Sequence, residues 1–341
     1  MTKITAKPFL KWAGGKTQLL SEIENRLPGT EIKCFIEPFI GSGAVTLHLT
    51  QNISSLEQVI INDRNPELVL VWNVIKYHVK PLIRILENRQ QEFTETTNKE
   101  VRKEIYYRTR TEFNDEVTKI DEINFTNFSE NNDFIKEFCI NRASQFIFLN
   151  RTCFNGLYRV NKKGQFNVPM GDYKNPLICD KENLMAVHEL LNHKNVKILS
   201  PNDYTIAKEE VNNLLKHYRP NEIFMYFDPP YRPLSQSSSF TAYSKYDFND
   251  EDQKKLAEFY HDMDEIGINV MLSNSDPTNT NENDLFFDDL FKKFGKVDEQ
   301  TGKVKVPRVQ ASRNINSKGA GRGKINEILV TNYDIKEECG S

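Results

Sequence analysis

The tetrapeptide Asp228-Pro229-Pro230-Tyr231 brings a carboxylate, a backbone carbonyl and an aromatic ring together directly after the apolar run 223–227. Two consecutive prolines fix φ and remove two backbone donors, so the turn after this expected strand is stiff. Such a turn lies at the edge of an α/β sheet where ligands bind. Transfer to an aromatic amine suits this set, because two acceptors can bind both amino hydrogens while the ring stacks on the base. A strand terminator with a surface tyrosine is the alternative.

A glycine-rich turn occurs in the run Glu37-Pro38-Phe39-Ile40-Gly41-Ser42-Gly43. Its glycines let the backbone approach a bound cofactor closely. Asp63, twenty residues beyond Gly43, ends the next apolar run, where a carboxylate can accept hydrogen bonds from both hydroxyls of a ribose. Thr46 replaces the third glycine of the GxGxxG fingerprint, which disfavours a Rossmann dehydrogenase. A dinucleotide site stays open as an alternative for this turn.

The N-terminal run Lys11-Trp12-Ala13-Gly14-Gly15-Lys16-Thr17 ends like a phosphate-binding loop. That loop needs a glycine six residues before its lysine, and this chain has Leu10 there. The remaining features are an aromatic side chain and a lysine around two glycines, which suit a cofactor with a carboxylate tail. An N-terminal arm that begins a helix is the other interpretation.

Taken in order, the motifs resemble those of the Dam-like family of DNA adenine-N6 methyltransferases, which belongs to the D12 class and the α group. The resemblance spans nearly the whole chain and rests on five motifs. They are Lys11-Trp12-Ala13-Gly14-Gly15-Lys16, residues 37–43, Asn62-Asp63, residues 228–231 and Phe240-Thr241-Ala242-Tyr243.

The resemblance implies a Rossmann-like S-adenosylmethionine-dependent methyltransferase sheet of about seven strands with helices on both faces, carrying an inserted, mainly helical DNA-recognition domain. Apolar runs at 34–36, 59–61, 196–199, 223–227, 268–272 and 325–330 alternate with helical patterns and independently predict a mostly parallel α/β sheet. Between 82 and 195 this alternation is replaced by helical patterns near Lys99–Phe113 and Phe134–Leu149. We expect a catalytic domain from 1–81 and 196–341, a recognition domain from 82–195 with a hairpin near 151–174, and a surface loop at 276–284.

The resemblance also implies roles for individual residues. Asp228, Pro229 and Tyr231 are expected to be catalytic, with Asp228 polarising the amine and Tyr231 stacking on a flipped base. Lys16 would lie near the methionine carboxylate and Asp63 would bind the ribose. The full set of expected contacts with S-adenosylmethionine is Trp12, Lys16, Glu37, Phe39, Gly41, Asp63, Asp203, Tyr204 and Asp228. No metal is expected.

A stretch near Asn150–Arg159 resembles the recognition hairpin of Dam-type enzymes specific for GATC. Arg159 matches an arginine that reads guanine, whose O6 and N7 acceptors suit a bidentate guanidinium; a phosphate clamp is the alternative role. Asp172 stands where Dam is basic, so we expect one phosphate contact to be missing. The expected DNA contacts are Lys11, Phe154, Asn155, Leu157, Arg159, Tyr173, Lys318 and Arg322.

Bulk composition limits the classes of protein. A net charge of −3 argues against a non-specific nucleic-acid coat, although basic residues gather in 150–175 and 300–326, as expected of a polyanion on one face. Five scattered cysteines support neither a disulfide frame nor a zinc site. No apolar run approaches the roughly 20 residues of a membrane span, and no secretory signal is evident.

We therefore expect a cytoplasmic, bacterial or phage protein without membrane contact. It would act as a monomer on double-stranded DNA, beside a cognate restriction endonuclease that works separately. Methylation at N4 of cytosine, a catalytically silent relative and an RNA-directed relative are the alternatives. Asp228 favours adenine over cytosine, because a serine in its place would favour cytosine.

Overall fold

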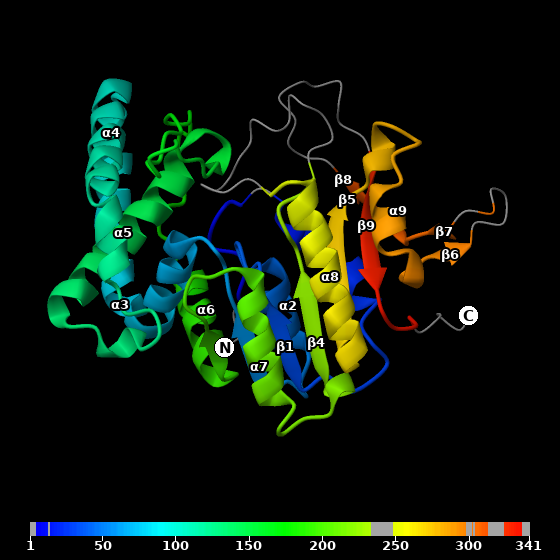
Figure 1. Cartoon of the computed structure of the whole chain (residues 1–341). Helices are drawn as coiled ribbons and strands as arrows, with labels where there is room; N and C mark the ends of the chain where they lie inside the picture. Colours follow the sequence, from blue (N-terminus) through cyan, green and yellow to red (C-terminus); the bar gives the residue numbers. More distant parts are fainter. Residues whose placement is uncertain are drawn as a thin grey trace.

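A mostly parallel sheet forms the centre of the computed structural model, which describes residues 5–12, 14–232, 248–297, 302, 304–312 and 324–335 (Figure 1). Within these residues the sheet has seven strands. Across the sheet they are β3 (Val196–Ile198), β2 (Gln58–Ile61), β1 (Cys34–Glu37), β4 (Ile223–Phe227), β5 (Asn269–Ser275), β9 (Lys324–Thr331) and β8 (Arg308–Ser312). The first five are parallel to one another, and β9 is antiparallel to both of its neighbours. The predicted Rossmann-like α/β sheet is confirmed.

Side chains of the central strands alternate between two apolar cores, as the two-residue period of a strand requires. Phe35 of β1 stacks on Phe224 of β4, with ring centroids 5.7 Å apart, in the core on one face. Their neighbours Ile36 and Met225 belong to the core on the opposite face. Both strands are buried throughout, which explains why they read as unbroken apolar runs in the sequence.

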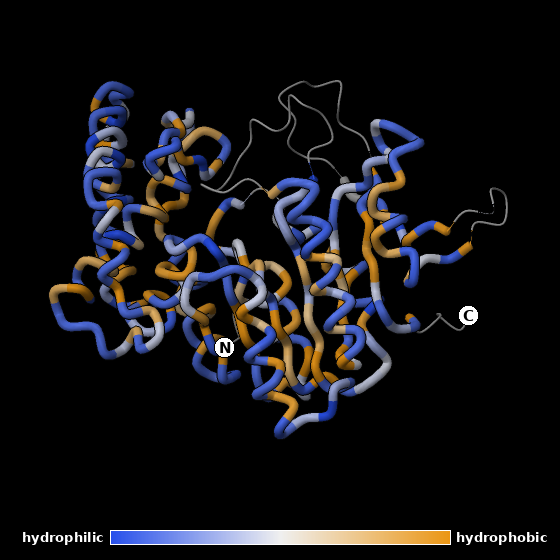
Figure 2. Tube along the Cα trace, viewed as in Figure 1, coloured by the Kyte–Doolittle hydropathy of each residue, from blue (hydrophilic) through white to orange (hydrophobic). Residues whose placement is uncertain are grey.

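Helices cover both faces of the sheet. One core includes side chains of α1 (Leu20–Glu24), α2 (Ala44–Asn52), α3 (Pro66–Glu95) and α6 (Lys181–His193). The other includes side chains of α7 (Ala207–Leu214), α8 (Asp250–Ile266) and α9 (Phe286–Leu290). Figure 2 shows the strands as mainly hydrophobic and the helices as alternating hydrophilic and hydrophobic stretches. No helix in the described residues has the length and apolar character needed to cross a membrane.

A helical lobe made from α3, α4 (Lys99–Asp115) and α5 (Asp133–Thr152) lies to the left of the sheet in Figure 1. It is inserted between two strands that pair directly, β2 and β3. The boundary expected between residues 81 and 82 falls inside α3, whose 30 residues are interrupted by a kink at His78. Pro81 explains the kink, because its ring removes a backbone donor and crowds the carbonyl of Tyr77.

A buried ion pair joins this lobe to the first turn of α3. Arg142 of α5 is fully buried, and its guanidinium donates to both carboxylate oxygens of Glu67. The same guanidinium donates to the carbonyl of Phe113, near the end of α4, at 2.9 Å. Three helices therefore meet at the guanidinium of Arg142, and its partner Glu67 lies four residues after Asp63 along the chain.

The structure corrects two expectations. Segment 276–284 is not wholly a surface loop, because Asp276 is fully buried and pairs with Arg308. Arg308 also pairs with buried Asp288, so this member of the C-terminal basic stretch points inward. The sequence missed β8, which begins at Arg308, since its mixed polar composition lacks an apolar run.

We predict that Arg142→Met lowers the free energy of unfolding by about 3–5 kcal/mol, because the substitution leaves the Glu67 carboxylate buried without its partner. The double variant Arg142→Met/Glu67→Leu should be more stable than this single variant. Urea unfolding followed by circular dichroism measures both. A single variant as stable as the wild type would contradict the importance of the pair.

Candidate active site

The candidate site lies where the strand order reverses. The chain passes from β1 to β2 and β3 on one side, while β4 and β5 pair on the other side of β1. In open α/β sheets, ligands bind beyond the carboxyl ends of the strands at such a switch point. Strand β1 ends at Glu37, and β4 ends directly before Asp228, so the topology brings the glycine turn and the tetrapeptide to one edge.

Lys16 contacts two residues of the tetrapeptide. Its ammonium nitrogen lies 2.7 Å from Oδ1 of Asp228 and 4.4 Å from the ring centroid of Tyr231. The lysine is only 4% exposed, whereas Asp228 is 19% exposed. The ammonium also donates to the carbonyl of Gly14 at 2.6 Å within the N-terminal arm, whereas its pair with Asp228 joins the arm to the turn. Burial raises the pKa of Asp228, and the charge of Lys16 acts in the opposite direction.

Neighbouring strands hold the polar groups of the tetrapeptide. The hydroxyl of Ser273 on β5 donates to Oδ1 of Asp228 at 3.1 Å and is 2.8 Å from the hydroxyl of Tyr226. The hydroxyl of Tyr231 donates to the carboxylate of Glu327 on β9. The carboxylate and the ring thus have separate anchors. Sequence analysis did not identify Ser273 or Glu327. The only local signal for Ser273 is the short polar run 273–275 that follows the apolar residues of β5.

The glycine turn is packed between two tryptophans. Gly41 has a φ of +47°, and a β-carbon there would lie 3.1 Å from the ring of Trp12. Gly43 has a φ of +73°, and a β-carbon would lie 2.5 Å from the ring of Trp72. The indole of Trp72 also donates to the carbonyl of Gly41 at 3.2 Å. Both positions therefore need glycine, for backbone conformation and for space.

Glu37 is a buried carboxyl beside this turn. Its side chain accepts hydrogen bonds from the backbone NH and the hydroxyl of Thr46, with 2.9 Å to the nitrogen. Thr46, at the position where a dinucleotide-binding fingerprint has glycine, therefore provides hydrogen bonds to Glu37. Burial raises the pKa of Glu37 to about 8, while the bonds from Thr46 act in the opposite direction.

Asp63 follows β2 at the same edge. Its carboxylate accepts from the backbone NH groups of Gly41, at 3.0 Å, and Asn65, at 2.8 Å. Burial raises the pKa of Asp63 to about 6, against the opposing effect of these bonds. The preceding residue, Asn62, donates to the carbonyl of Asn202 at 2.8 Å. Its buried side-chain oxygen has no donor among the described residues, so it can accept a hydrogen bond from a ligand.

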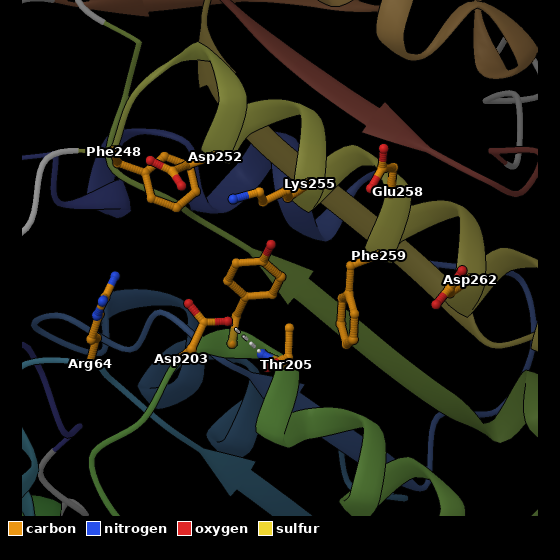
Figure 3. Close-up of a pocket in the computed structure, with 10 residues that line it drawn as sticks. Arg64, Asp203, Thr205, Phe248, Asp252, Lys255, Glu258, Phe259 and Asp262 are labelled. Atoms are coloured by element: carbon orange, nitrogen blue, oxygen red, sulfur yellow. Dashed lines mark hydrogen bonds between the residues drawn. The ribbon is translucent and has the colours of Figure 1, made fainter.

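A pocket of about 540 Å³ opens beside these loops, between the segment after β3 and helix α8 (Figure 3). Asp203 and Tyr204 line one side, and Asp252, Lys255 and Phe259 line the other. Phe39 packs on the ring of Tyr204, with centroids 5.5 Å apart. The described residues that line the pocket do not include Lys16 or Asp228. Of the expected cofactor contacts, Asp203 and Tyr204 therefore lie at this pocket, whereas Lys16 and Asp228 form the separate ion pair.

The segment after α5 folds back on itself as an antiparallel hairpin. Isolated bridges join Cys153 to Met170 and Val160 to Phe166. Arg159 is exposed between them, and its Nε donates to the side chain of Asn167 at 2.7 Å. The further expected contact residues Phe154, Asn155 and Leu157 lie on the same hairpin, with Phe154 52% exposed and Asn155 in the left-handed region.

The N-terminal arm lies against this hairpin. The side chain of Asn150 binds both the NH and the carbonyl of Lys11, each at 2.8 Å. The ammonium of Lys11 lies 4.0 Å from the ring centroid of Tyr173. Arg151 donates to the carbonyl of Phe9, so this basic residue binds the arm.

Asp172 and the C-terminal part of the expected interface complete the set of sequence predictions. Asp172 forms an exposed ion pair with Lys99 at 3.0 Å. The expected residues Lys318 and Arg322, and the motif at residues 240–243, lie outside the described residues.

This sheet and site have the architecture of a Rossmann-like methyltransferase. The family model for D12 class N6 adenine-specific DNA methyltransferases matches residues 12–305. The chain therefore belongs to that family, and its activity is adenine methylation of DNA. Membership selects adenine over cytosine as the methylated base.

Relatives support the same conclusion along nearly the whole chain. The Type II methyltransferase M.MjaIII of Methanocaldococcus jannaschii is 46% identical over 332 residues, covering 96% of this chain and 99% of that protein. The Type II methyltransferase M1.LlaDCHI of Lactococcus lactis subsp. cremoris is 38% identical, covering 97% of each chain. The DNA adenine methylase of Escherichia coli (strain K12) is 32% identical, covering 95% of this chain and 94% of that protein.

We predict that Glu37 makes folding less favourable as the pH rises. The unfolded chain loses this proton near pH 4.5 and the folded protein only near pH 8, so the unfolded state binds fewer protons within that window. Relative to Glu37→Gln, the wild type should lose up to about 1.4 kcal/mol of unfolding free energy per pH unit there. Urea unfolding across the window tests this, and parallel curves for the two proteins would contradict it.

Proposed function

We propose that this chain transfers a methyl group from S-adenosylmethionine to N6 of an adenine flipped out of duplex DNA, within the sequence GATC. The observation that carries the proposal is the position of the Lys16 nitrogen. This donor lies at hydrogen-bond distance from Asp228 and over the ring of Tyr231. A target amine needs the same surroundings, with a carboxylate to accept its hydrogen and an aromatic face to stack its base.

The residues at the sheet edge fit S-adenosylmethionine. Gly41 and Gly43 allow the tight turn packed against the two tryptophans, Asp63 offers a carboxylate to ribose hydroxyls, and Asn62 offers a buried acceptor. The pocket beside Asp203 and Tyr204 has an aromatic wall that suits an adenine ring. When bound, this cofactor supplies an electrophilic methyl group on a sulfonium.

Asp228 then has two tasks. Its carboxylate orients the amine, and it can accept the proton that the nitrogen loses as the nitrogen–carbon bond forms and the carbon–sulfur bond breaks. Burial that raises the pKa of Asp228 makes it a better proton acceptor. Lys16 and the amine cannot occupy the same position, so we expect Lys16 to turn toward the carboxylate tail of the cofactor as adenine enters.

The helical lobe and the hairpin are the proposed recognition domain, spanning 82–195. Arg159 is exposed on the hairpin, and Lys162 and Lys163 lie exposed at its tip, where they suit phosphate contacts. The guanidinium of Arg159 has the fork geometry that guanine requires. GATC is inferred from the similarity of residues 150–159 to the hairpin of Dam-type enzymes. Lys11 would add a contact from the arm that also carries Trp12.

We predict that Asp228→Ala lowers the single-turnover rate of DNA methylation by roughly 100-fold or more, because the variant lacks the acceptor for the amine proton. The fold should persist, as judged by circular dichroism and the unfolding midpoint. Asp289→Ala, which changes an exposed aspartate of α9, serves as the matched control with a normal rate. Near-normal turnover by Asp228→Ala would overturn the assigned reaction centre.

We predict that Arg159→Ala loses discrimination at one base pair of the target, by about 1–3 kcal/mol. Competition between GATC duplexes and duplexes with single substitutions measures this loss. Lys163→Ala, on the same hairpin, should instead weaken binding equally on all sequences. If Arg159→Ala behaves like Lys163→Ala, Arg159 is a phosphate clamp.

The overall proposal is tested with S-adenosylmethionine carrying a labelled methyl group and duplex DNA of mixed sequence. Mapping the label identifies the methylated atom and its flanking bases. Label on N6 of adenine outside GATC would keep the reaction and refute the target sequence. Label on no DNA base would refute the reaction.

A further inference from the structure

Two buried side-chain amides connect the backbone groups on either side of Tyr231. Gln253 of α8 is 2% exposed, and its Nε2 donates to the carbonyl of Pro230 at 3.0 Å. Asn274 of β5 is fully buried, and its Oδ1 accepts from the NH of Arg232 at 3.2 Å. The two amides also bind each other, because Nδ2 of Asn274 donates to Oε1 of Gln253 at 3.0 Å.

These side-chain hydrogen bonds begin where the backbone pairing between β4 and β5 ends. The register of β4 with β5 ends at Phe227 opposite Leu272. Beyond it, Pro229 and Pro230 have no NH groups, so the turn cannot continue the ladder. Three successive residues of β5 bind the turn through their side chains instead. Ser273 donates to Asp228, Asn274 accepts from the NH of Arg232, and Ser275 donates to the carbonyl of Arg232 at 2.9 Å.

The orientation of each amide is determined by its partners. Gln253 must present its nitrogen to the carbonyl of Pro230, which leaves its oxygen for Asn274. The oxygen of Asn274 accepts from two backbone NH groups, those of Arg232 and Ser275. Reversing either amide would place like groups against each other in a buried site, which is costly. The pair therefore defines one position of the Tyr231 backbone.

Helix α8 is itself tied to the turn, which places Gln253. A capping box between Asn249 and Asp252 begins the helix one turn before this residue. The guanidinium of Arg232 forms a bidentate pair with Asp250, at 2.8 and 3.0 Å. Arg232, which directly follows the tetrapeptide, thus binds Asp250, the first residue of the helix that carries Gln253.

We propose that Gln253 and Asn274 are positioning residues for methyl transfer. They hold the carbonyl of Pro230 and the NH of Arg232, and so orient the carbonyl of Pro229 and the ring of Tyr231 relative to Asp228. Neither amide contacts the reacting atoms. The proposal rests on the proposed function, in which this turn is the reaction centre.

The first test replaces each amide by an apolar side chain of similar size, in Gln253→Met and Asn274→Leu. The single-turnover methylation rate should fall roughly 10- to 100-fold, as expected when reacting groups are misplaced by a fraction of an ångström to an ångström. Dissociation constants for S-adenosylhomocysteine and for target duplex should change less than about twofold, since neither amide belongs to a binding surface. Fluorescence of 2-aminopurine at the target adenine reports how the flipped base stacks.

The second test uses pH. In Gln253→Glu, a protonated carboxyl can donate to the carbonyl of Pro230 and accept from Asn274, whereas an ionised one cannot donate and repels that carbonyl. The rate of this variant divided by the wild-type rate should therefore be near one at low pH and fall as pH rises. Circular dichroism over the same pH range shows whether Gln253→Glu stays folded, so a fall in the rate of the folded variant reports the position of the turn. The low-pH rescue holds even if Gln253→Met folds poorly.

The matched control is Asn269→Leu, which removes a buried amide from the opposite end of β5, where it binds Thr30 and the carbonyl of Asn221. It should retain the wild-type rate. A wild-type rate in Gln253→Met, or a pH-independent rate ratio in Gln253→Glu, would overturn the proposal. Activity in Asp228→Ala would instead refute the proposed reaction centre, so the two failures are distinguishable.

Discussion

The ion pair between Lys16 and Asp228 joins the N-terminal arm to the turn after β4 and so holds two segments that are distant in sequence together at one edge of the sheet. A carboxylate in a mostly buried position needs compensation from nearby positive charge and donors. Lys16 supplies the charge, and Ser273 supplies a donor. The ammonium also binds the carbonyl of Gly14 within the arm, and Trp12 of the same arm packs against Gly41 of the glycine turn.

The arm also connects the proposed reaction centre to the helical lobe. Asn150 at the end of α5 binds the backbone of Lys11, and Arg151 binds the carbonyl of Phe9. Trp12 stacks on Tyr158, the neighbour of Arg159, with ring centroids 5.6 Å apart. At the other side of the lobe, Arg142 binds Glu67 near the loop that carries Asp63. The proposed base-reading hairpin and the proposed cofactor site are therefore joined by direct packing.

Much of the fold follows from local pattern. Each of the six apolar runs coincides with a strand to within one residue. The central strands β1, β4 and β5 are buried on both faces and therefore carry apolar residues at consecutive positions. The helical patterns near Lys99 and Phe134 correspond to α4 and α5, and the asparagines at 98 and 132 cap them. The edge strand β8 could not be predicted in this way, because its mixed polar sequence contains no apolar run. The buried position of Asp276 could not be predicted either, because its partner Arg308 is distant in sequence.

The sequence by itself determined the class of chemistry and the strand ends that carry it. Two prolines after an apolar strand, two glycines after another and an aspartate after a third are local features, and parallel strands bring their carboxyl ends to one edge. Only the tertiary structure decided which groups meet there. It paired Lys16 with Asp228, turned Arg151 and Arg308 inward, and placed Ser273, Gln253 and Asn274 against the turn that we propose to be catalytic. The physical reason is that hydrogen bonds and ion pairs between distant segments depend on strand order and helix packing, which local residue spacing does not contain.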